Sequence, residues 1–391
     1  MDKKVGIVSC YFKKNYGSML QAYATQKILD DWGIPNETIH LEKLNSEISK
    51  GKRKYYKSQL FNFSFIKAKF GMVKLKLYCK FANGELGKNI KIRNQKFKEF
   101  EKKFHLSKSY DKIETICQEG NYTDVLVGSD QLWLPVNIVA DYYTLNFVPE
   151  EVNKISFATS FGVSSVPEKY KKQYQTFLNR IEHLSVREDK GVQLVKELTG
   201  REAELVCDPT LLFNQEEWRE IQAEERLIKE RYIFCYFLGK TVEYRKFAER
   251  LKEKTGFKIV SLNHLDEYVK YSDKFADEAP FDVGPSEFLN LIRNAEFVCT
   301  DSFHGTVFSL IHQKKFFVFR RYQNKSKVST NSRLDSLLKI VNLSDRMLEG
   351  NEAVDELVEK EIDYDWVNEK LEKFREESKT FLRGALENGK N

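Results

Sequence analysis

The sequence has no run of roughly 18 or more apolar residues, so no ordinary transmembrane helix is expected. Its first apolar stretch is too short for a signal peptide, and Lys13 and Lys14 interrupt it. The six cysteines form no Cys-x-x-Cys pair and have no histidine at ligand spacing, which argues against a zinc site or a disulfide framework. We therefore expect a cytoplasmic protein whose cysteines are mostly small buried hydrophobic residues.

A large excess of one charge is also missing from the chain as a whole. The sequence has 64 Lys and Arg against 58 Asp and Glu, and a net charge of +6 is too modest to argue for nucleic-acid binding. At 41% hydrophobic residues the chain is too apolar to be disordered, and its 391 residues are too many for one ordinary core. Two globular domains are therefore expected.

The order of the apolar runs predicts alternating strands and helices. The first half has expected strands at 5–11, 124–128, 154–158 and 184–187, and helices at 19–32 and 188–198. The second half has expected strands at 232–237, 258–262, 297–300 and 315–319, helices at 242–254, 285–294 and 305–312, and a terminal amphipathic helix at 366–386. This pattern predicts α/β domains at 1–225 and 226–345 and a helical segment at 346–391, with function at the strands' C-terminal ends.

Two glycine-containing turns follow strands of the first domain. In NYGSMLQ at 15–21, the small residues let an anionic ligand approach a helix N-terminus, although a tight strand-to-helix turn explains the same pattern. In GSDQLW at 128–133, hydroxyl, carboxylate, amide and indole groups suit a sugar, with Asp130 and Gln131 on hydroxyls and Trp133 stacked on the ring. The alternative is an aspartate helix cap beside a core tryptophan.

Two further strand ends carry ionisable groups. Arg187 ends a buried strand just before a helix, where it suits a carboxylate or phosphate, unless it merely pairs with Glu188 or Asp189 at the surface. His304 lies between the strand at 297–300 and the next helix, where it suits a general acid or base. A lone histidine is more often structural, but the flanking Asp301, Ser302, Gly305 and Thr306 favour a functional role.

Taken together, six pieces of the chain resemble the polysaccharide pyruvyl transferase family. They are NYGSMLQ at 15–21, GSDQLW at 128–133, SFATSFG at 156–162, LSVRED at 184–189, DPTLL at 208–212 and TDSFHG at 300–305. The resemblance implies two Rossmann-like domains facing a cleft, as in B-type glycosyltransferases. It also implies transfer of the carbon skeleton of phosphoenolpyruvate to two hydroxyls of a sugar, which gives a pyruvate ketal on a surface polysaccharide or its lipid-linked precursor.

The resemblance also assigns roles to residues. Arg187 matches the family arginine that binds the donor's charged groups, and His304 matches the catalytic histidine. Apart from the resemblance, the chemistry of the reaction gives Asp130 or Asp301 one of two roles, as the base that removes the acceptor's proton or as a residue that only orients the acceptor. We place the donor on the second domain, at Ser302 and Gly305, and the acceptor on the first domain. The acceptor residues are Asn15, Tyr16, Gly17, Ser129, Gln131 and Trp133.

One position departs from the family pattern. Many members have an arginine two residues before the histidine, where this chain has Ser302. Another cation must then bind the donor, unless the donor differs. The candidates downstream are Lys314, Arg320, Arg321 and Arg333. We favour Arg333 because it opens a predicted helix.

Ketal formation needs acid–base groups and donors that stabilise anions, so no cofactor is expected besides phosphoenolpyruvate as co-substrate, and no metal. Two other functions remain open. The chain could be a B-type glycosyltransferase that uses a nucleotide sugar, or a non-catalytic glycan-binding protein of a surface-polysaccharide assembly.

A basic, aromatic segment interrupts the first domain at about 48–105. It holds 17 Lys and Arg and three acids, a net charge of +14, which leaves −8 for the rest of the chain. It contains no recognisable nucleic-acid-binding module. It is either a solvated helical insertion that packs its aromatics on the first domain, or a surface that rests on the anionic inner face of the cell membrane and receives a lipid-linked acceptor.

Overall fold

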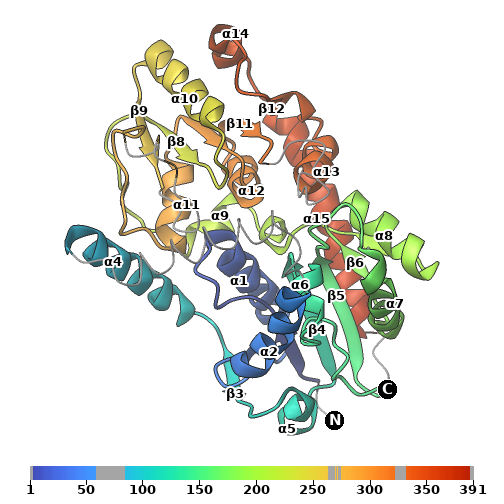
Figure 1. Cartoon of the computed structure of the whole chain (residues 1–391). Coiled ribbons are helices and arrows are strands. Elements are labelled where there is room, and N and C mark those ends of the chain that lie inside the picture. Colours follow the sequence, from blue (N-terminus) through green and yellow to red (C-terminus); the bar gives the residue numbers. More distant parts are fainter. Residues whose placement is uncertain are drawn as a thin grey trace.

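Two parallel β-sheets form the frame of the protein (Figure 1). The computed structural model describes residues 3–58, 84–262, 269, 271, 274–321 and 332–387. In this part of the chain the first sheet has the strand order β3-β2-β1-β4-β5-β6-β7, and the second has the order β12-β11-β10-β8-β9. The predicted α/β class with two Rossmann-like domains is confirmed.

The strands are short and mostly buried. Those of the first sheet are β1 (Val5–Val8), β2 (Asn36–His40), β3 (Leu106–Ser109), β4 (Asp124–Asp130), β5 (Asn153–Thr159), β6 (Ser185–Val186) and β7 (Glu204–Leu205). Those of the second are β8 (Tyr232–Tyr236), β9 (Lys258–Ser261), β10 (Phe297–Thr300), β11 (Lys315–Phe319) and β12 (Met347–Leu348). The central strands are buried on both faces of the sheet, so their sequences are nearly continuous runs of apolar residues. Such runs allowed these strands to be predicted from the sequence.

Helices connect the strands and cover the sheets. They are α1 (Tyr16–Asp31), α2 (Asn45–Lys57), α4 (Gly84–Glu101), α5 (Ile116–Gly120), α6 (Pro135–Ile138), α7 (Lys171–Arg180), α8 (Asp189–Thr199), α9 (Gln215–Arg219), α10 (Val242–Thr255), α11 (Pro285–Arg293), α12 (Phe303–Ile311), α13 (Ser332–Ile340), α14 (Val354–Glu359) and α15 (Tyr364–Glu387). Short 3-10 turns lie at η1 (Ile113–Thr115), η2 (Glu168–Tyr170), η3 (Pro209–Leu212) and η5 (Ser344–Arg346). No described helix is long and apolar enough to cross a bilayer.

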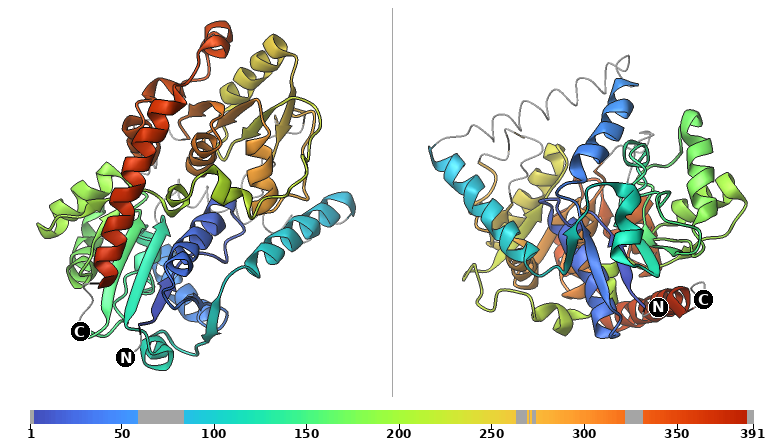
Figure 2. Two further views of the ribbon diagram at one scale, coloured as in Figure 1. Left: turned by 180° about the vertical axis from the view of Figure 1, so that it is seen from behind. Right: turned by 90° about the horizontal axis from the view of Figure 1, so that it is seen from below.

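The terminal helix α15 returns from the second domain to the first and runs along the back of the molecule (Figure 2). The amide of Asn153 donates to the carbonyl of Ala385 at 2.9 Å. The N–H of Cys207 donates to the hydroxyl of Ser378 at 2.8 Å. The predicted amphipathic helix therefore closes the first domain, although it comes last in the sequence.

The helix α4 of the basic segment packs between the two domains. Its residues Phe97 and Phe100 are buried, and the ring of Phe97 lies 5.1 Å from that of Tyr16 on α1. Its Lys96 ammonium lies 2.7 Å from the carboxylate of Glu287 on α11. In α4, therefore, the aromatic residues of the segment are core residues, while most of its lysines face solvent. Most aromatics of the segment, from Phe61 to Phe81, lie outside the described residues.

Candidate active site

A cavity of about 580 Å³ lies between the two domains. One wall comes from the first domain and consists of Lys13, Lys14, Asn15, Ser18, Asp130 and Gln131. The other comes from the second domain and consists of Leu238, Asp301, Ser302, Phe303, His304, Arg321, Arg333 and Leu334. These residues follow β1, β4, β8, β10 and β11 or open the helices α1, α12 and α13. Parallel sheets place such strand ends along one edge, which is where α/β proteins bind ligands.

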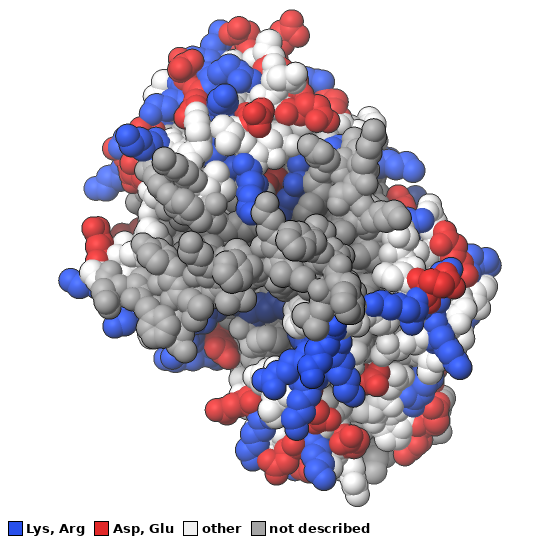
Figure 3. Space-filling view, viewed as in Figure 1, with Lys and Arg blue, Asp and Glu red and all other residues white. Residues whose placement is uncertain are grey.

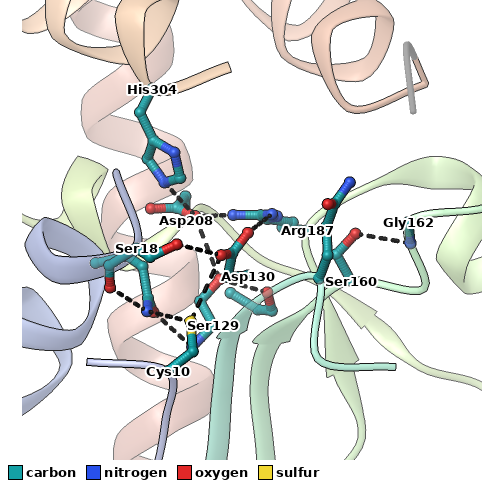
Figure 4. Close-up of polar contacts among 12 residues, drawn as sticks. Cys10, Ser18, Ser129, Asp130, Ser160, Gly162, Arg187, Asp208 and His304 are labelled. Carbon is teal, nitrogen blue, oxygen red and sulfur yellow. Dashed lines mark hydrogen bonds and ion pairs between the residues drawn. The ribbon is translucent and has the colours of Figure 1, made fainter. Parts of the chain in front are cut away.

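His304 points from α12 across the cleft toward Asp208 of the first domain (Figure 4). Its Nε2 lies 3.6 Å from Oδ2 of Asp208. The other carboxylate oxygen, Oδ1, accepts hydrogen bonds from the N–H and the hydroxyl of Thr210, at 3.1 and 2.7 Å. The carboxylate is therefore fixed, and it can orient the imidazole and stabilise its protonated form.

Asp208 is ionised although it is buried. Burial raises its pKa, but the interactions with His304 and Arg187 outweigh that effect, and the pKa lies well below the usual range. No role was predicted for Asp208, although it belongs to the DPTLL piece at 208–212, one of the six pieces that carry the family resemblance. The DPTLL piece was therefore the feature of the sequence from which Asp208 could have been predicted as a site residue.

Arg187 lies behind the cavity wall and is not one of the lining residues. Its side chain is fully buried and pairs with Asp130, at 3.1 Å, and with Asp208 through a short contact. The alternative of a surface pair with Glu188 or Asp189 is therefore wrong. The predicted direct contact of Arg187 with the donor is therefore corrected, because its guanidinium pairs with Asp130 and Asp208 and does not line the cavity.

Asp130 is the centre of a second group of polar contacts. Its Oδ2 accepts a hydrogen bond from the Ser18 hydroxyl at 2.7 Å, and its Oδ1 pairs with Arg187. Burial raises the pKa of Asp130, but the charges of Lys13 and Arg187 outweigh it and hold the pKa well below the usual range. A carboxylate held so firmly in its ionised form is a poor proton acceptor. The structure thus favours an orienting role for Asp130 over the predicted role of base.

The carboxylate of Asp301, like that of Asp130, is held by hydrogen bonds. Its two oxygens accept hydrogen bonds from the backbone N–H groups of Leu238 and Gly239, at 2.6 and 2.8 Å, and burial raises its pKa. Asp301 therefore fixes the loop after β8 against the start of α12.

Ser302 and Gly305 open α12 in different ways. Ser302 lines the cavity and caps the helix, because its hydroxyl accepts from the N–H of Gly305 at 3.3 Å. Gly305 is not a lining residue, and a Cβ there would lie 2.5 Å from the hydroxyl of Thr300. It therefore permits close packing of α12 on β10, and its predicted contact with the donor is corrected.

Among the described residues, four cations line the cavity: Lys13, Lys14, Arg321 and Arg333. Arg333, the preferred replacement for the missing family arginine, lies 5.5 Å from the ring of Phe303, and burial lowers its pKa to about 10. Arg320 instead pairs with Asp335 at 2.9 Å, and Lys314 donates to the carbonyl of Ala295. Neither lines the cavity. The lysines at 13 and 14 were not predicted, although they directly precede the NYGSMLQ turn.

The structure divides the predicted acceptor residues into two sets. Asn15 and Gln131 line the cavity, as does Ser18, which was not predicted. Trp133 is fully buried against Phe161 and Phe177, and its indole N–H donates to the carbonyl of Tyr143. The prediction that it stacks on a sugar is therefore wrong, because the ring is part of the core.

Tyr16, Gly17 and Ser129 are also corrected as acceptor contacts. The ring of Tyr16 stacks on Phe288 of the second domain, with centroids 4.6 Å apart. The hydroxyl of Ser129 is buried and donates to the carbonyl of Ala158 at 2.6 Å. Gly17 lies against His304 and does not line the cavity. These residues support the site from behind.

No three His, Cys, Asp or Glu side chains come together as a metal-binding group in the part of the chain that the structure describes. The site thus consists of a histidine, three fixed carboxylates, and cations on both walls of a cleft between Rossmann-like domains. Such a combination is suited to group transfer from an anionic donor.

The fold and the site described above are consistent with one known protein family. A family model for polysaccharide pyruvyl transferase matches residues 15–323. The chain belongs to the polysaccharide pyruvyl transferase family, which is a family of transferases. No curated protein matches the sequence.

Several solved structures are similar to this chain at low sequence identity. UDP-N-acetylglucosamine 2-epimerase from Rickettsia bellii is 9% identical with a TM-score of 0.51, covering 99% of this chain and 97% of that one. UDP-GlcNAc 2-epimerase from Methanocaldococcus jannaschii is 11% identical with a TM-score of 0.48, covering 95% and 92%. MurG from Acinetobacter baumannii is 9% identical with a TM-score of 0.43, covering 96% and 95%. The likeness to the first shows a shared fold and nothing of the substrate.

Proposed function

We propose that this protein transfers the carbon skeleton of phosphoenolpyruvate to two hydroxyls of a sugar and so forms a pyruvate ketal. The observation that carries the proposal is the position of His304. It faces a cavity between the domains, Asp208 holds it from across the cleft, and Arg321 and Arg333 line the same cavity. An acid–base group beside cations is what an anionic enol donor requires.

In the proposed reaction, protonated His304 donates a proton to the methylene carbon of the donor. One sugar hydroxyl attacks the resulting cationic carbon, and the imidazole takes up the proton of that hydroxyl. Phosphate then leaves and carries away the proton of the second hydroxyl, whose oxygen closes the ketal. Asp208 stays ionised throughout and stabilises the imidazolium, because its pKa lies far below neutrality.

The donor would lie on the second-domain wall. Arg321 and Arg333 supply the charge that the family arginine supplies at the position of Ser302, and a planar guanidinium suits both the carboxylate and the phosphate of phosphoenolpyruvate. The acceptor sugar would lie on the opposite wall, on Asn15, Ser18 and Gln131. The reaction as written needs no cofactor beyond its co-substrate.

The reaction is tested by mass spectrometry of incubations with phosphoenolpyruvate and a panel of synthetic and lipid-linked glycosides. The expected product has the mass of the acceptor with an added pyruvate ketal, and phosphate is released in equal amount. The rival donor, a nucleotide sugar, is tested by melting temperature, since a ligand that binds only the folded state raises it. Stabilisation by a nucleotide sugar and not by phosphoenolpyruvate would replace this proposal with glycosyl transfer.

We further place the reaction at the inner face of the cell membrane, on a lipid-linked precursor of a surface polysaccharide. Lys and Arg side chains gather over α2 (Figure 3), where Lys50, Arg53, Lys54 and Lys57 are exposed. Each basic residue at an anionic membrane contributes about 1 kcal/mol to binding. Flotation with phosphatidylcholine vesicles, with and without phosphatidylglycerol, should show binding that requires the anionic lipid and weakens in high salt. No association at low salt would remove the membrane from the proposal.

A further inference from the structure

The first residue of α1 inserts its side chain into the second domain. The ring of Tyr16 stacks on that of Phe288 on α11, with the centroids 4.6 Å apart and the ring planes 2° apart. Its hydroxyl donates to the backbone carbonyl of Val283 at 3.1 Å, and its ring meets that of Tyr236, at the end of β8, edge-on with centroids 5.8 Å apart. Only 4% of Tyr16 is exposed to solvent. A side chain of the first domain is therefore part of the core of the second.

Helix α4 binds to the same place. The ring of Phe97 lies 5.1 Å from that of Tyr16, and the guanidinium of Arg93 lies 4.5 Å from the first ring and 5.4 Å from the second. One turn along the helix, the ammonium of Lys96 lies 2.7 Å from the carboxylate of Glu287 on α11. Helix α4 thus contacts the second domain both directly and through Tyr16.

We call Tyr16, Phe97 and Phe288 the aromatic clamp. We propose that the aromatic clamp holds the two domains in the closed arrangement before any substrate binds, so that His304 and Asp208 are assembled in advance and not by substrate-driven closure. The clamp is argued from its own geometry, and only its consequence for turnover rests on the proposed function.

The aromatic clamp needs no ligand to form. Its three rings are at most 4% exposed, and none of them lines the cavity. Buried aromatic rings that stack or meet edge-on stabilise one another by dispersion and by the interaction of their quadrupoles, besides the apolar area that they remove from water. The closed arrangement is therefore stabilised by side chains of the chain itself.

The contact on the opposite side of the cleft is of a different kind. There α8 of the first domain meets α13 of the second (Figure 1). The hydroxyl of Ser336 accepts from the N–H of Asp189 at 3.1 Å and donates to its carboxylate at 3.3 Å. Hydrogen bonds of this kind are readily exchanged for bonds to water, whereas separated aromatic rings lose their burial. We thus place the fixed side of the cleft at the clamp, and the side that opens for substrate at α8 and α13.

The aromatic clamp acts on the histidine through the neighbouring residue. Gly17 follows Tyr16 and lies directly against the imidazole of His304, which pairs across the cleft with Asp208 at 3.6 Å. Without the clamp the two domains are free to separate at this point. The apparent affinity for substrates that contact both walls then falls in proportion to the fraction of molecules that are closed.

The first experiment needs no substrate. Small-angle X-ray scattering should give a larger radius of gyration for Tyr16→Leu than for the wild type, and a smaller increase for Lys96→Met, which loses only the ion pair. Calorimetry should show one unfolding transition for the wild type and separate transitions of the two domains for Tyr16→Leu. Tyr16→Phe should resemble the wild type because it keeps the ring. Tyr170→Leu is the matched control, since the ring of Tyr170 stacks on Tyr55 within the first domain.

The second experiment adds substrates. The radius of gyration of the wild type should not change with saturating phosphoenolpyruvate, whose binding is verified by a rise in melting temperature. Tyr16→Leu should raise KM for the donor and the acceptor about 10-fold, as expected when about a tenth of the molecules are closed. Its kcat should stay near that of the wild type, because saturating substrates restore the closed arrangement. A variant that had merely lost folded protein would instead show a lower kcat at unchanged KM.

Three results would overturn the inference. They are a wild-type radius of gyration in Tyr16→Leu, a wild type that contracts when phosphoenolpyruvate binds, and a single transition in Tyr16→Leu at a lower temperature. If Tyr16→Leu does not fold, the radius of Lys96→Met decides, because its ion pair is partly exposed and its loss leaves the core intact. If phosphoenolpyruvate does not bind at all, the proposed function fails, whereas the clamp is still judged by scattering and calorimetry without substrate.

Discussion

Gly17 lies directly against the imidazole of His304. A Cβ at residue 17 would come within 2.0 Å of Nδ1 and 2.3 Å of Cγ of that ring. The two residues belong to different domains, so the N-terminus of α1 and that of α12 can approach only because residue 17 has no side chain. The position of the proposed catalytic histidine thus depends on a glycine in the first domain.

Replacing Gly17 with alanine should therefore displace His304 and lower kcat about 100-fold, as misplacement of a reacting group by about 1 Å does. The helix itself should not suffer, since alanine is a better helix former than glycine by about 1 kcal/mol. Gly384→Ala in α15 is the control, because no atom lies within 4 Å of a Cβ there. Phosphate release and melting temperature are measured for both, and normal turnover of the Gly17 variant would show that the ring is not held as described.

His304→Ala should reduce turnover about 100-fold to 10,000-fold while the fold is kept, since the imidazole moves protons in the proposed reaction. The control is His105→Ala, because His105 is an exposed histidine that pairs with Asp30 at 3.7 Å on the surface. Turnover is followed by phosphate release and folding by circular dichroism. Near-normal activity of His304→Ala would remove it from the mechanism.

Arg333→Met should raise KM for phosphoenolpyruvate about 10-fold or more, because it removes a cation from the donor wall. The control is Arg320→Met, which removes the same charge 13 residues earlier in the chain. Arg320 does not line the cavity and pairs with the half-exposed Asp335. That variant should keep the wild-type KM. Should both variants behave alike, Arg333 would lose its assigned role and only the overall charge would matter.

His312 should make the protein less stable in mild acid. It is buried, its Nε2 lies 3.1 Å from the amide of Gln222, and burial, together with the charges of Lys314 and Arg293, lowers its pKa to about 3. The unfolded chain, with a histidine pKa of about 6.5, binds the proton more tightly than the folded protein does. Stability is therefore lost as the pH falls from about 6.5 toward 3, by up to about 1.4 kcal/mol per unit from this group.

The measurement is urea unfolding of the wild type and His312→Leu at pH 7 and pH 5. The leucine variant should lose less free energy of unfolding between the two pH values, because its residue 312 does not titrate. Its absolute stability is not the readout, since Gln222 loses a partner in this variant. An identical pH dependence in the two proteins would show that His312 is not protonated on unfolding.

Local sequence predicted eight of the twelve described strands and led us to expect the site at their C-terminal ends, whereas β2, β3, β7 and β12 were not predicted. The expected strands at 297–300 and 315–319 match β10 and β11 residue for residue, because each is a short apolar run that ends at a polar residue. Helix α1 begins at Tyr16 and not at the expected 19, since Asn15 caps it. Parallel strands place their C-terminal ends along one edge, so polar residues that follow such strands could be assigned to one cleft from the sequence alone.

Only the tertiary structure decided what each of these residues contacts. The sequence could not distinguish a sugar platform from a core residue at Trp133, because an aromatic side chain after a strand suits both, and only the packing of Phe161 and Phe177 buries it. The sequence also could not predict that His304 contacts Asp208 or that Arg93 contacts Lys14, since the partners in each pair are far apart in the chain. Such contacts depend on how the two domains and α4 pack together, and packing has no local signal in the sequence.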